Sequence, residues 1–311
     1  MSAPLAKALR RLLGRRGTWA IGNAVAAVAT WLGLVSSRRE GRPRGVSATV
    51  ITYDDPDWLW LSLRAASEVA EEVLVIDSSD PWDETLEVLE RAREELGVKV
   101  YRQYPPRGYA EARREALRRS TYSWILVWDS DFIPFEGFRR AFRDALEGLL
   151  DDRGYYMLYW PWVTLCGDLS HRCRADRYHV EHWAFTYSSR LRYDWDGRFE
   201  YLRAPPYYFR RWLSREPQGL HLTGVRRPER LALKELSRRV NFYEVASSKG
   251  MEEAMKLVRR EAARLYGTED LREVGLRIMR EMARGRPPFD VGLIPREVLD
   301  RAKEIGVPVT A

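Results

Sequence analysis

The chain has 311 residues, and its 52 basic and 45 acidic side chains give a formal net charge of +7. Apolar residues make up 45% and charged residues 31%, which excludes a wholly disordered chain and a polytopic membrane protein. Two cysteines exclude a secreted fold built on a disulfide framework. Asn and Gln together number only four, which favours a thermophilic source, although GC-rich coding would also enrich Arg.

Nearly all of the positive charge lies in the first 45 residues, which contain nine basic side chains and one acid, Glu40. Residues 46–311 are balanced, with 43 bases and 44 acids. Between two basic clusters lies the uncharged stretch 18–35 (TWAIGNAVAAVATWLGLV). As a helix this stretch would be about 27 Å long, slightly shorter than the roughly 30 Å hydrocarbon core of a bilayer.

Three interpretations of this stretch stay open. Trp19 and Trp31 near its ends favour a membrane interface, whereas Asn23 and the many Ala residues make it weakly apolar. The two rivals are a helix packed on the main domain and a cleaved signal peptide, for which the small residues 27–29 offer a cleavage site. We expect contact with a membrane surface through residues 1–45. This places the protein at the cytoplasmic face of the cell membrane or in the cytoplasm.

After a linker at 36–45, segments typical of strands and helices alternate along the chain. The expected strands are 46–52, 72–77, 98–102 and 124–128, and the expected helices are 58–72, a segment after 83 and 109–120. Near-continuous apolar strands that alternate with helices indicate a mostly parallel α/β sheet with helices on both faces. In such sheets ligands bind beyond the carboxyl ends of the strands.

The pattern divides the chain into three parts. Residues 1–45 form a basic and apolar N-terminal helix with its linker, residues 46–227 the α/β domain, and residues 228–311 a helical extension. Within the extension, the four apolar residues Leu233, Leu236, Val240 and Tyr243 recur at helical spacing and predict one continuous helix.

Carboxylates follow three of the expected strands. Asp129-Ser130-Asp131 comes directly after the apolar run WILVW, and Asp77 follows the strand at 72–77. Two carboxylates spaced i, i+2 at a strand end can face one site, where their hard oxygen atoms suit Mg²⁺ or Mn²⁺. An Asp-x-Asp alone is more often a solvated turn; the acids at the neighbouring strand ends favour a binding site.

These segments together resemble the family 2 glycosyltransferases, which have the Rossmann-like GT-A fold. VSATVITYDDPDWLWLSLRA is similar to the first strand, turn and helix of that family, and EEVLVIDSSDPWDETLEVL to its second strand. RQYPPRGYAEARREALRRSTYSWILVWDSDFIP is similar to its Arg-containing helix and its Asp-x-Asp strand. The resemblance covers about residues 46–135, with the motifs in the right order and spacing.

The resemblance implies a nucleotide-sugar site with residues in named roles. Asp77 would accept a hydrogen bond from the base, Asp129 would approach the ribose and the metal, and Asp131 would ligate the metal. The remaining nucleotide-binding residues would be Thr52, Tyr53, Asp55, Arg107 and Arg113. The segment 78–80 (Ser-Ser-Asp) departs from the family's usual Asp-Gly-Ser turn and leaves the base preference open.

An inverting glycosyl transfer needs a base that takes the proton of the acceptor hydroxyl, and a carboxylate is the usual choice. On the pattern of the family Glu200 is the first candidate and Glu181 the second, with Phe199 in place of an expected His. The resemblance also makes His221 a candidate metal ligand.

A cluster of Cys and His residues has a competing interpretation. Both cysteines and three of the four histidines fall within 17 residues, at Cys166, His171, Cys173, His179 and His182. Zinc binding, a disulfide and unrelated packing stay open for this cluster. Nearby aromatic side chains could stack on sugar rings of an acceptor. The candidates for this acceptor wall are Trp160, Trp162, Trp183 and Trp195.

We expect a metal-dependent inverting glycosyltransferase of the hexosyltransferase type. It would move a sugar from a nucleoside-diphosphate donor to a hydroxyl of a glycan, lipid or protein. The alternatives are an enzyme like the sugar-nucleotide pyrophosphorylases and a non-enzymatic, membrane-associated nucleotide-binding module. The absence of Gly from the turn after the first strand counts against the pyrophosphorylase. Nucleic acid is not an expected partner, because residues 46–311 are neutral and carry no basic stripe.

Overall fold

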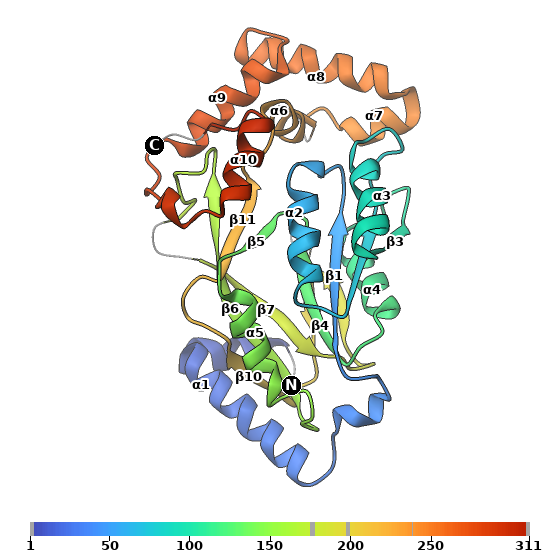
Figure 1. Ribbon diagram of the computed structural model, residues 1–311, viewed down its shortest axis with the longest axis vertical. Helices are drawn as coiled ribbons and strands as arrows, with labels where there is room; N and C mark the ends of the chain where they lie inside the picture. The colour runs from blue at the N-terminus through green and yellow to red at the C-terminus, as the bar shows by residue number, and fades with distance from the viewer. Residues whose placement is uncertain (1–2, 175–177, 197–199, 238, 309–311) are drawn as a thin grey trace. The chain divides into compact units, whose positions relative to one another are not determined.

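The computed structural model describes residues 3–174, 178–196, 200–237 and 239–308 (Figure 1). The chain divides into two compact units. The first unit comprises Met1–Pro161 with Val180–Gln218, and the second comprises Trp162–His179 with Gly219–Ala311. The expected domain limits at 45/46 and 227/228 stay a prediction.

A mostly parallel sheet forms the centre of the first unit, with its strands in the order β3-β2-β1-β4-β7-β6. Its strands are β1 (Val46–Thr52), β2 (Glu72–Asp77), β3 (Lys99–Arg102), β4 (Trp124–Asp129), β6 (Tyr155–Cys166), β7 (His179–Thr186) and β10 (Tyr208–Trp212). β1 pairs in parallel with β2 and β4, and β7 runs antiparallel to β4. β10 pairs in parallel with β6. The strands at 46–52 and 72–77 have the predicted bounds.

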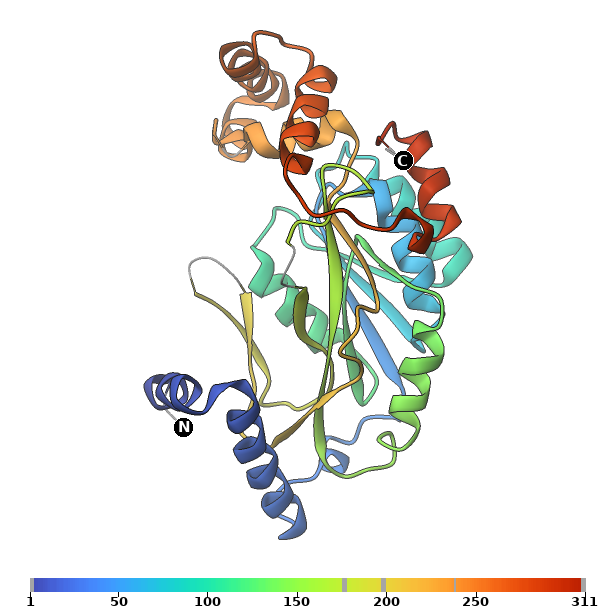
Figure 2. The same cartoon turned by 90° about the vertical axis from the view of Figure 1, so that its left-hand side faces the viewer.

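Helices cover both faces of this sheet. They are α2 (Pro56–Ser67), α3 (Thr85–Leu96), α4 (Tyr109–Arg119) and α5 (Phe138–Glu147). α4 lies on one face and α2 and α5 on the other (Figure 2). Ala112 and Ala116 of α4 pack on Leu74 and Ile76 of β2, which fixes α4 above the carboxyl half of the sheet. The mixed α/β class and the mostly parallel sheet are therefore confirmed.

Two further strand elements extend the first unit. β5 (Phe132–Pro134) follows β4, and β8 (Arg192–Trp195) pairs antiparallel with β9 (Glu200–Arg203). The Arg114 side chain on α4 donates a hydrogen bond from Nε to the Tyr193 carbonyl at 2.8 Å. This bond ties the β8–β9 pair to α4. Phe199 lies outside the described residues.

The N-terminal segment forms helix α1 (Ala3–Trp31), which has a break at Gly14 (φ 63°, ψ −174°), followed by the 3-10 helix η1 (Ser37–Glu40). Among the α1 side chains that pack on the rest of the first unit are Trp19, which contacts the rings of Tyr159 and Trp212, and Asn23, which bonds to Arg210. Within the part of the chain that the structure describes, no helix is long and apolar enough to cross a membrane.

The second unit contains the end of β6, the strand β11 and a set of helices. They are β11 (Gly219–Gly224), α6 (Pro228–Ser237), α7 (Phe242–Lys249), α8 (Met251–Tyr266), α9 (Leu271–Ala283), η2 (Val291–Leu293) and α10 (Arg296–Glu304). β11 runs parallel to the end of β6, with Leu220 opposite Val163. α6 crosses α9 so closely that a Cβ at Gly275 would lie 1.9 Å from the Pro228 carbonyl oxygen.

The continuous helix expected from Leu233 to Tyr243 is wrong. α6 ends at Ser237, and α7 begins only at Phe242, so Val240 lies between two helices. Asn241, which precedes α7, has a left-handed backbone (φ 50°) that a continuous helix cannot contain.

Candidate active site

The carboxyl ends of three parallel strands bring the expected nucleotide-binding residues to one edge of the first unit. In the strand register Thr52 of β1 lies opposite Asp77 of β2, and Ile51 lies opposite Asp129 of β4. Among the described residues, the Thr52 hydroxyl is buried without a hydrogen-bond partner. A buried, unpartnered hydroxyl at the end of a central strand is suited to accept or donate a bond to a ligand.

Asp77 is fully buried, and both of its carboxylate oxygens are engaged. Oδ1 accepts the Ser79 backbone N–H at 2.9 Å, and Oδ2 forms an ion pair with the Arg102 guanidinium. Arg102 lies opposite Asp77 at the end of β3 and also donates to the Ser79 carbonyl at 2.8 Å. The ion pair therefore presents the guanidinium, and not the carboxylate, at the surface of this strand edge.

The turns after β1 and β2 are bonded to each other. Asp54 has a left-handed backbone (φ 47°), and its N–H donates to Ser79 Oγ at 2.9 Å. Its Oδ1 accepts the Asp80 N–H, also at 2.9 Å. Burial raises the pKa of the Asp80 carboxyl group above its ordinary value. These two bonds tie the turn after β1 to the turn after β2.

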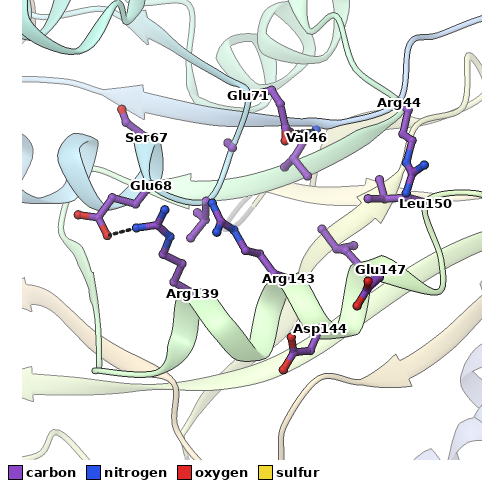
Figure 3. A pocket seen from close by; sticks show the side chains of 13 residues that line it. Arg44, Val46, Ser67, Glu68, Glu71, Arg139, Arg143, Asp144, Glu147 and Leu150 are labelled. Carbon is purple, nitrogen blue, oxygen red and sulfur yellow. Dashed lines mark hydrogen bonds and ion pairs between the residues drawn. The ribbon is translucent and has the colours of Figure 1, made fainter.

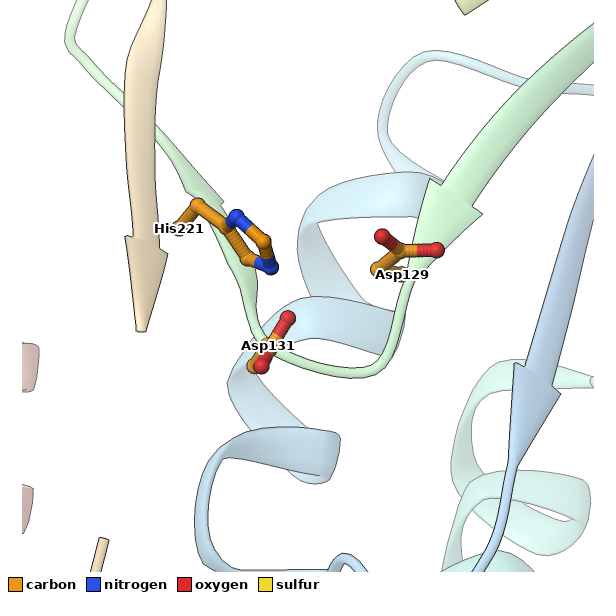
Figure 4. Close-up of side chains that lie close together, drawn as sticks. All are labelled: Asp129, Asp131 and His221. Atoms are coloured by element: carbon orange, nitrogen blue, oxygen red, sulfur yellow. The ribbon is translucent and has the colours of Figure 1, made fainter. Parts of the chain in front are cut away.

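Asp129 and Asp131 lie at the end of β4 and in the turn that follows it (Figure 4). Asp129 forms an ion pair with Arg113 of α4, whose guanidinium also donates to the Thr49 carbonyl at 3.4 Å. Between the two acids, Ser130 Oγ donates to Asp55 Oδ2 at 2.6 Å. Asp131 is buried. The predicted Asp-x-Asp turn is thus held by the Arg113 side chain of α4 and by the Asp55 side chain at the residue before α2.

The Arg113 guanidinium is buried together with the phenol of Tyr193. Burial alone would lower the pKa of Arg113, but the carboxylate of Asp129, together with Tyr193 and Glu200, raises it above the ordinary value. Burial raises the pKa of the Tyr193 phenol, and the charges of Glu181, Glu200 and Asp129 add to this effect. Both candidate bases therefore lie within the electrostatic reach of the Asp129–Arg113 pair.

The remaining members of the expected set differ in exposure. Arg107 is exposed in the loop before α4, and Glu181 is exposed on β7, whereas Glu200 at the start of β9 is half-buried. Of the four Trp residues expected to form an acceptor wall, Trp160, Trp162 and Trp183 are core residues. That part of the expectation is wrong, because these three rings pack in the core and are not accessible to an acceptor.

Trp195 is the exposed member of the expected aromatic wall. It is 48% exposed, and its ring stacks on Tyr109 at the start of α4, with 6.5 Å between the ring centroids and 21° between the planes. Both residues belong to the first unit. The pair forms an accessible aromatic surface on the unit that carries the strand-end carboxylates.

In the second unit, His221 on β11 contacts Thr164 and His179. Its Nδ1 lies 3.4 Å from Thr164 Oγ1 and 3.3 Å from His179 Nδ1. Cys166 and Cys173 form a disulfide with 5.0 Å between their Cα atoms. His171 instead pairs with Asp168, Nδ1 to Oδ1 at 2.9 Å. The zinc alternative for the two cysteines is therefore wrong, and the disulfide alternative is confirmed.

A surface hollow of about 450 Å³ lies at the opposite end of the first unit's sheet (Figure 3). Val46, the first residue of β1, lines it together with charged side chains of α5, and Arg139 pairs there with Glu68 at 3.7 Å. None of the expected site residues lines this hollow. Because ligands of parallel sheets bind at the carboxyl ends, we do not assign the hollow to the site.

Residues 47–148, which contain β1 to β4 and both strand-end aspartates, match the family model of glycosyl transferase family 2. The chain carries a family 2 glycosyltransferase domain. The predicted family and the predicted enzyme class are thereby confirmed, and the pyrophosphorylase and the non-enzymatic module are not supported. No curated protein matches the chain.

Three solved structures are similar to the glycosyltransferase chain over part of its length. S. aureus TarS 1–349 in complex with UDP-GlcNAc has a TM-score of 0.41 and 15% identity over 83% of this chain and 72% of that chain. S. aureus TarS has a TM-score of 0.38 and 15% identity over 70% of this chain and 43% of that chain, so the chain spans less than half the length of this relative. Glucosyl-3-phosphoglycerate synthase from Mycobacterium tuberculosis, in complex with Mn²⁺, UDP and glucosyl-3-phosphoglycerate, has a TM-score of 0.29 and 18% identity over 40% and 46%.

The sequence did not single out two residues that the structure places next to the strand-end pairs, Arg102 and Tyr193. Arg102 ends a short strand whose register places it opposite Asp77, so a register prediction for 98–102 could have found it. Tyr193 lies on β8, far from the family motifs in sequence, and no sequence signal marks its contact with α4.

Proposed function

We propose that this glycosyltransferase transfers a sugar, with inversion and with a divalent metal ion, from a nucleoside-diphosphate donor to an acceptor hydroxyl. The observation that carries the proposal is the ion pair between Asp129 at the end of β4 and the buried guanidinium of Arg113. It lies within the family 2 domain and is followed by the buried Asp131. The acceptor would belong to a glycan, a lipid or a protein.

Asp129 and Asp131 would hold the metal ion. Their oxygen atoms are hard ligands, which fits Mg²⁺ or Mn²⁺. When bound, the ion would neutralise the negative charge that develops on the departing diphosphate. Arg113 supports this role because its guanidinium donates to Oδ1 of Asp129 and so holds the carboxylate in place.

His221 is the third ligand in this proposal. The resemblance of the sequence to the family carries this assignment. The bonds of the nearby residue Gln218 to the first unit support its inclusion. Gln218, three residues earlier, accepts the Phe135 N–H and donates its own N–H to the Pro161 carbonyl, both at 2.9 Å.

The nucleoside would bind along the ends of β1, β2 and β3. Thr52, Tyr53 and Asp55 would border the base and ribose, and Arg107 would approach the phosphates from the loop before α4. Because the oxygens of Asp77 are already engaged, Asp77 would act on the base together with Arg102, whose N–H groups can donate to acceptor atoms of the base.

Glu200 would be the catalytic base, with Glu181 as the alternative. The carboxylate takes the proton of the acceptor hydroxyl while the acceptor oxygen bonds to the anomeric carbon. The bond from that carbon to the donor phosphate oxygen breaks, and the nucleoside diphosphate leaves. The aromatic pair Trp195–Tyr109 would support the acceptor, since sugar faces stack on such rings.

Residues 1–45 would contact a membrane surface, which places the enzyme at the cytoplasmic face of the cell membrane. The excess of eight positive charges in this segment supports that partner, because the cytoplasmic leaflet is anionic.

The donor site can be tested by thermal-shift titration of the full chain with nucleoside diphosphates and nucleotide-sugars, each with and without Mg²⁺ or Mn²⁺. We expect metal-linked stabilisation by at least one diphosphate, because a ligand that binds the folded state raises the unfolding temperature. Asp131→Ala should abolish the metal-linked part, whereas the control Asp144→Ala on α5 should preserve it. A shift that needs no metal, or that survives Asp131→Ala, would contradict the proposal.

A further inference from the structure

Helix α1 has two faces with opposite environments. On one face, Trp19, Asn23 and Ala26 are directed at the first unit. Ala26 is fully buried, and the Asn23 amide donates to the Arg210 carbonyl at 3.1 Å and accepts its N–H at 2.7 Å. The polar residue that makes the segment a poor membrane span is therefore used in packing on the protein.

The opposite face of α1 is an exposed apolar stripe. It consists of Ile21, Val25, Val28 and Leu32, whose spacing of four, three and four residues places them along one side of a helix. Their exposed fractions lie between 45% and 56%. Trp31 and Leu34, at the end of the helix, are 77% and 65% exposed. A contiguous apolar surface of this kind marks an interaction site.

The charge around the stripe is positive. Arg16, Arg38 and Arg39 are exposed, whereas Arg44 pairs with Asp151 at 3.0 Å. The one acid of the segment, Glu40, faces the protein, where its carboxylate accepts the Tyr155 hydroxyl and the Ser189 N–H, both at 3.0 Å. The outer surface of the N-terminal segment therefore combines apolar side chains with exposed basic ones.

We propose that α1 lies in the plane of an anionic bilayer, with the stripe of Ile21, Val25, Val28 and Leu32 inserted among the lipid chains. The helix does not cross the bilayer, because its other face holds the first unit. A bilayer fits better than a second copy of this chain, since two copies joined through this face would bring their basic groups together. The inference builds on the membrane contact proposed for residues 1–45 and assigns that contact to one helix face.

The geometry is that of an interfacial helix, for which binding combines buried apolar area with attraction to anionic lipids. Trp31 lies at the end of the stripe, where an interfacial indole ring is favourable. Arg side chains near the helix ends would remain at the level of the headgroups. The donor site on the same unit would then operate on acceptors at or near the bilayer surface.

Flotation of the full-length protein with vesicles tests the inference. Vesicles of equal parts phosphatidylcholine and phosphatidylglycerol should carry the protein, and pure phosphatidylcholine vesicles should carry less. The double variant Val25→Ser/Val28→Ser should reduce the partition coefficient about tenfold or more, because each substitution removes apolar surface from the lipid. Trp31→Ser is a milder variant expected to act in the same direction.

Leu293→Ser and Trp82→Ser are matched controls, because both side chains are 58% exposed but lie outside α1. They should leave flotation unchanged. The inference is overturned if Val25→Ser/Val28→Ser and Trp31→Ser both float like the unsubstituted protein. It is also overturned if the double variant changes a dimer to a monomer in light scattering while neither form floats. The thermal shift with nucleoside diphosphate and metal should persist in both variants, so a failure here leaves the glycosyltransferase proposal intact.

Discussion

Two Asp–Arg pairs lie at the carboxyl ends of β2 and β4, the strands on either side of β1, and the pairs differ in which partner is buried. At β2 the Asp77 side chain is 0% exposed and its partner Arg102 is 37% exposed. At β4 the Arg113 side chain is 6% exposed and its partner Asp129 is 26% exposed. The first pair presents a cation at the strand edge, and the second presents an anion.

This inversion gives the site an electrostatic polarity along the sheet edge. The end near β2 and β3 offers hydrogen-bond donors, which suit the carbonyl and ring nitrogen acceptors of a nucleobase. The end near β4 offers carboxylate oxygens, which suit a divalent ion. A nucleoside diphosphate with its metal ion has the complementary order, from base to charged phosphates.

The largest effect is expected for Glu200, whose negative charge helps to raise the pKa of Arg113 in the β4 pair. Glu200→Gln should lower the turnover of the donor by roughly 10²–10⁴-fold, since the amide cannot take a proton. The assay is metal-dependent hydrolysis of a nucleotide-sugar, and the thermal-shift titration selects which nucleotide-sugar to use. The matched variant Glu181→Gln should retain most of the activity. If the two variants exchange these results, the base is Glu181.

The next largest effect concerns the stability of the β4 pair without metal. Asp129→Asn leaves the buried Arg113 charge unpaired and should lower the free energy of unfolding by about 3–5 kcal/mol. Arg113→Met should cost less, because the remaining Asp129 carboxylate reaches water. Urea unfolding of both variants measures the difference. Equal losses would mean that the buried position of Arg113 does not decide the energetics.

At the β2 pair, replacing the Arg should lower the free energy of unfolding more than replacing the Asp. Arg102→Met leaves the enclosed Asp77 carboxylate with the Ser79 N–H and should cost about 1–3 kcal/mol. Asp77→Asn should cost less, because the Arg102 guanidinium remains accessible to water. The same urea experiment applies, and the nucleotide thermal shift should weaken in Arg102→Met. A larger loss for Asp77→Asn would contradict the inverted arrangement.

A third ion pair joins Glu72, the first residue of β2, to Lys99, the first residue of β3. It lies at the opposite end of these strands from the candidate site and should show the smallest effect. Burial would raise the pKa of Glu72, but hydrogen bonds from Lys99, Ser47 and Thr121 lower it below its ordinary value of 4.5. Because the folded pKa is depressed, the stabilisation is present above that value and is lost as the pH falls through the folded pKa.

Glu72→Gln should therefore flatten the acid side of the stability profile measured by thermal unfolding from neutral to acidic pH. Glu90→Gln is a suitable control, since Glu90 pairs with Arg93 on the surface at 2.9 Å. An unchanged acid limb in Glu72→Gln would show that this pair contributes nothing to acid sensitivity.

The sequence predicted the sheet well because its strands are apolar on both faces. Runs such as VSATVIT and EVLVID can be placed only in a covered parallel sheet, and this placement determines which acids follow a strand end. Asp77 and Asp129 therefore lie at the carboxyl ends of their strands, with Asp131 in the turn that follows, as expected. The partners of these acids could not be predicted in the same way, because Arg102 depends on the register of β3 and Tyr193 on a separate strand pair.

Other expectations failed where local sequence does not determine burial. Trp160 and Trp162 are spaced i, i+2 and share one face of β6, but the spacing does not say whether that face is covered, and both are fully buried. The two cysteines were ambiguous because spacing alone does not reveal the turn between them. In the structure Leu165 bridges Arg172, and this antiparallel turn brings Cys166 and Cys173 together.

The bonds between Asn23 and Arg210 also affect how the enzyme can be shortened. β10 pairs with β6 on one side, and the Asn23 amide bonds to the backbone N–H and C=O of Arg210. α1 therefore caps a sheet edge that would otherwise be open to strand pairing with another molecule. Removing residues 1–44 would uncover this edge, so an N-terminally truncated enzyme should be prone to self-association for reasons unrelated to lipid.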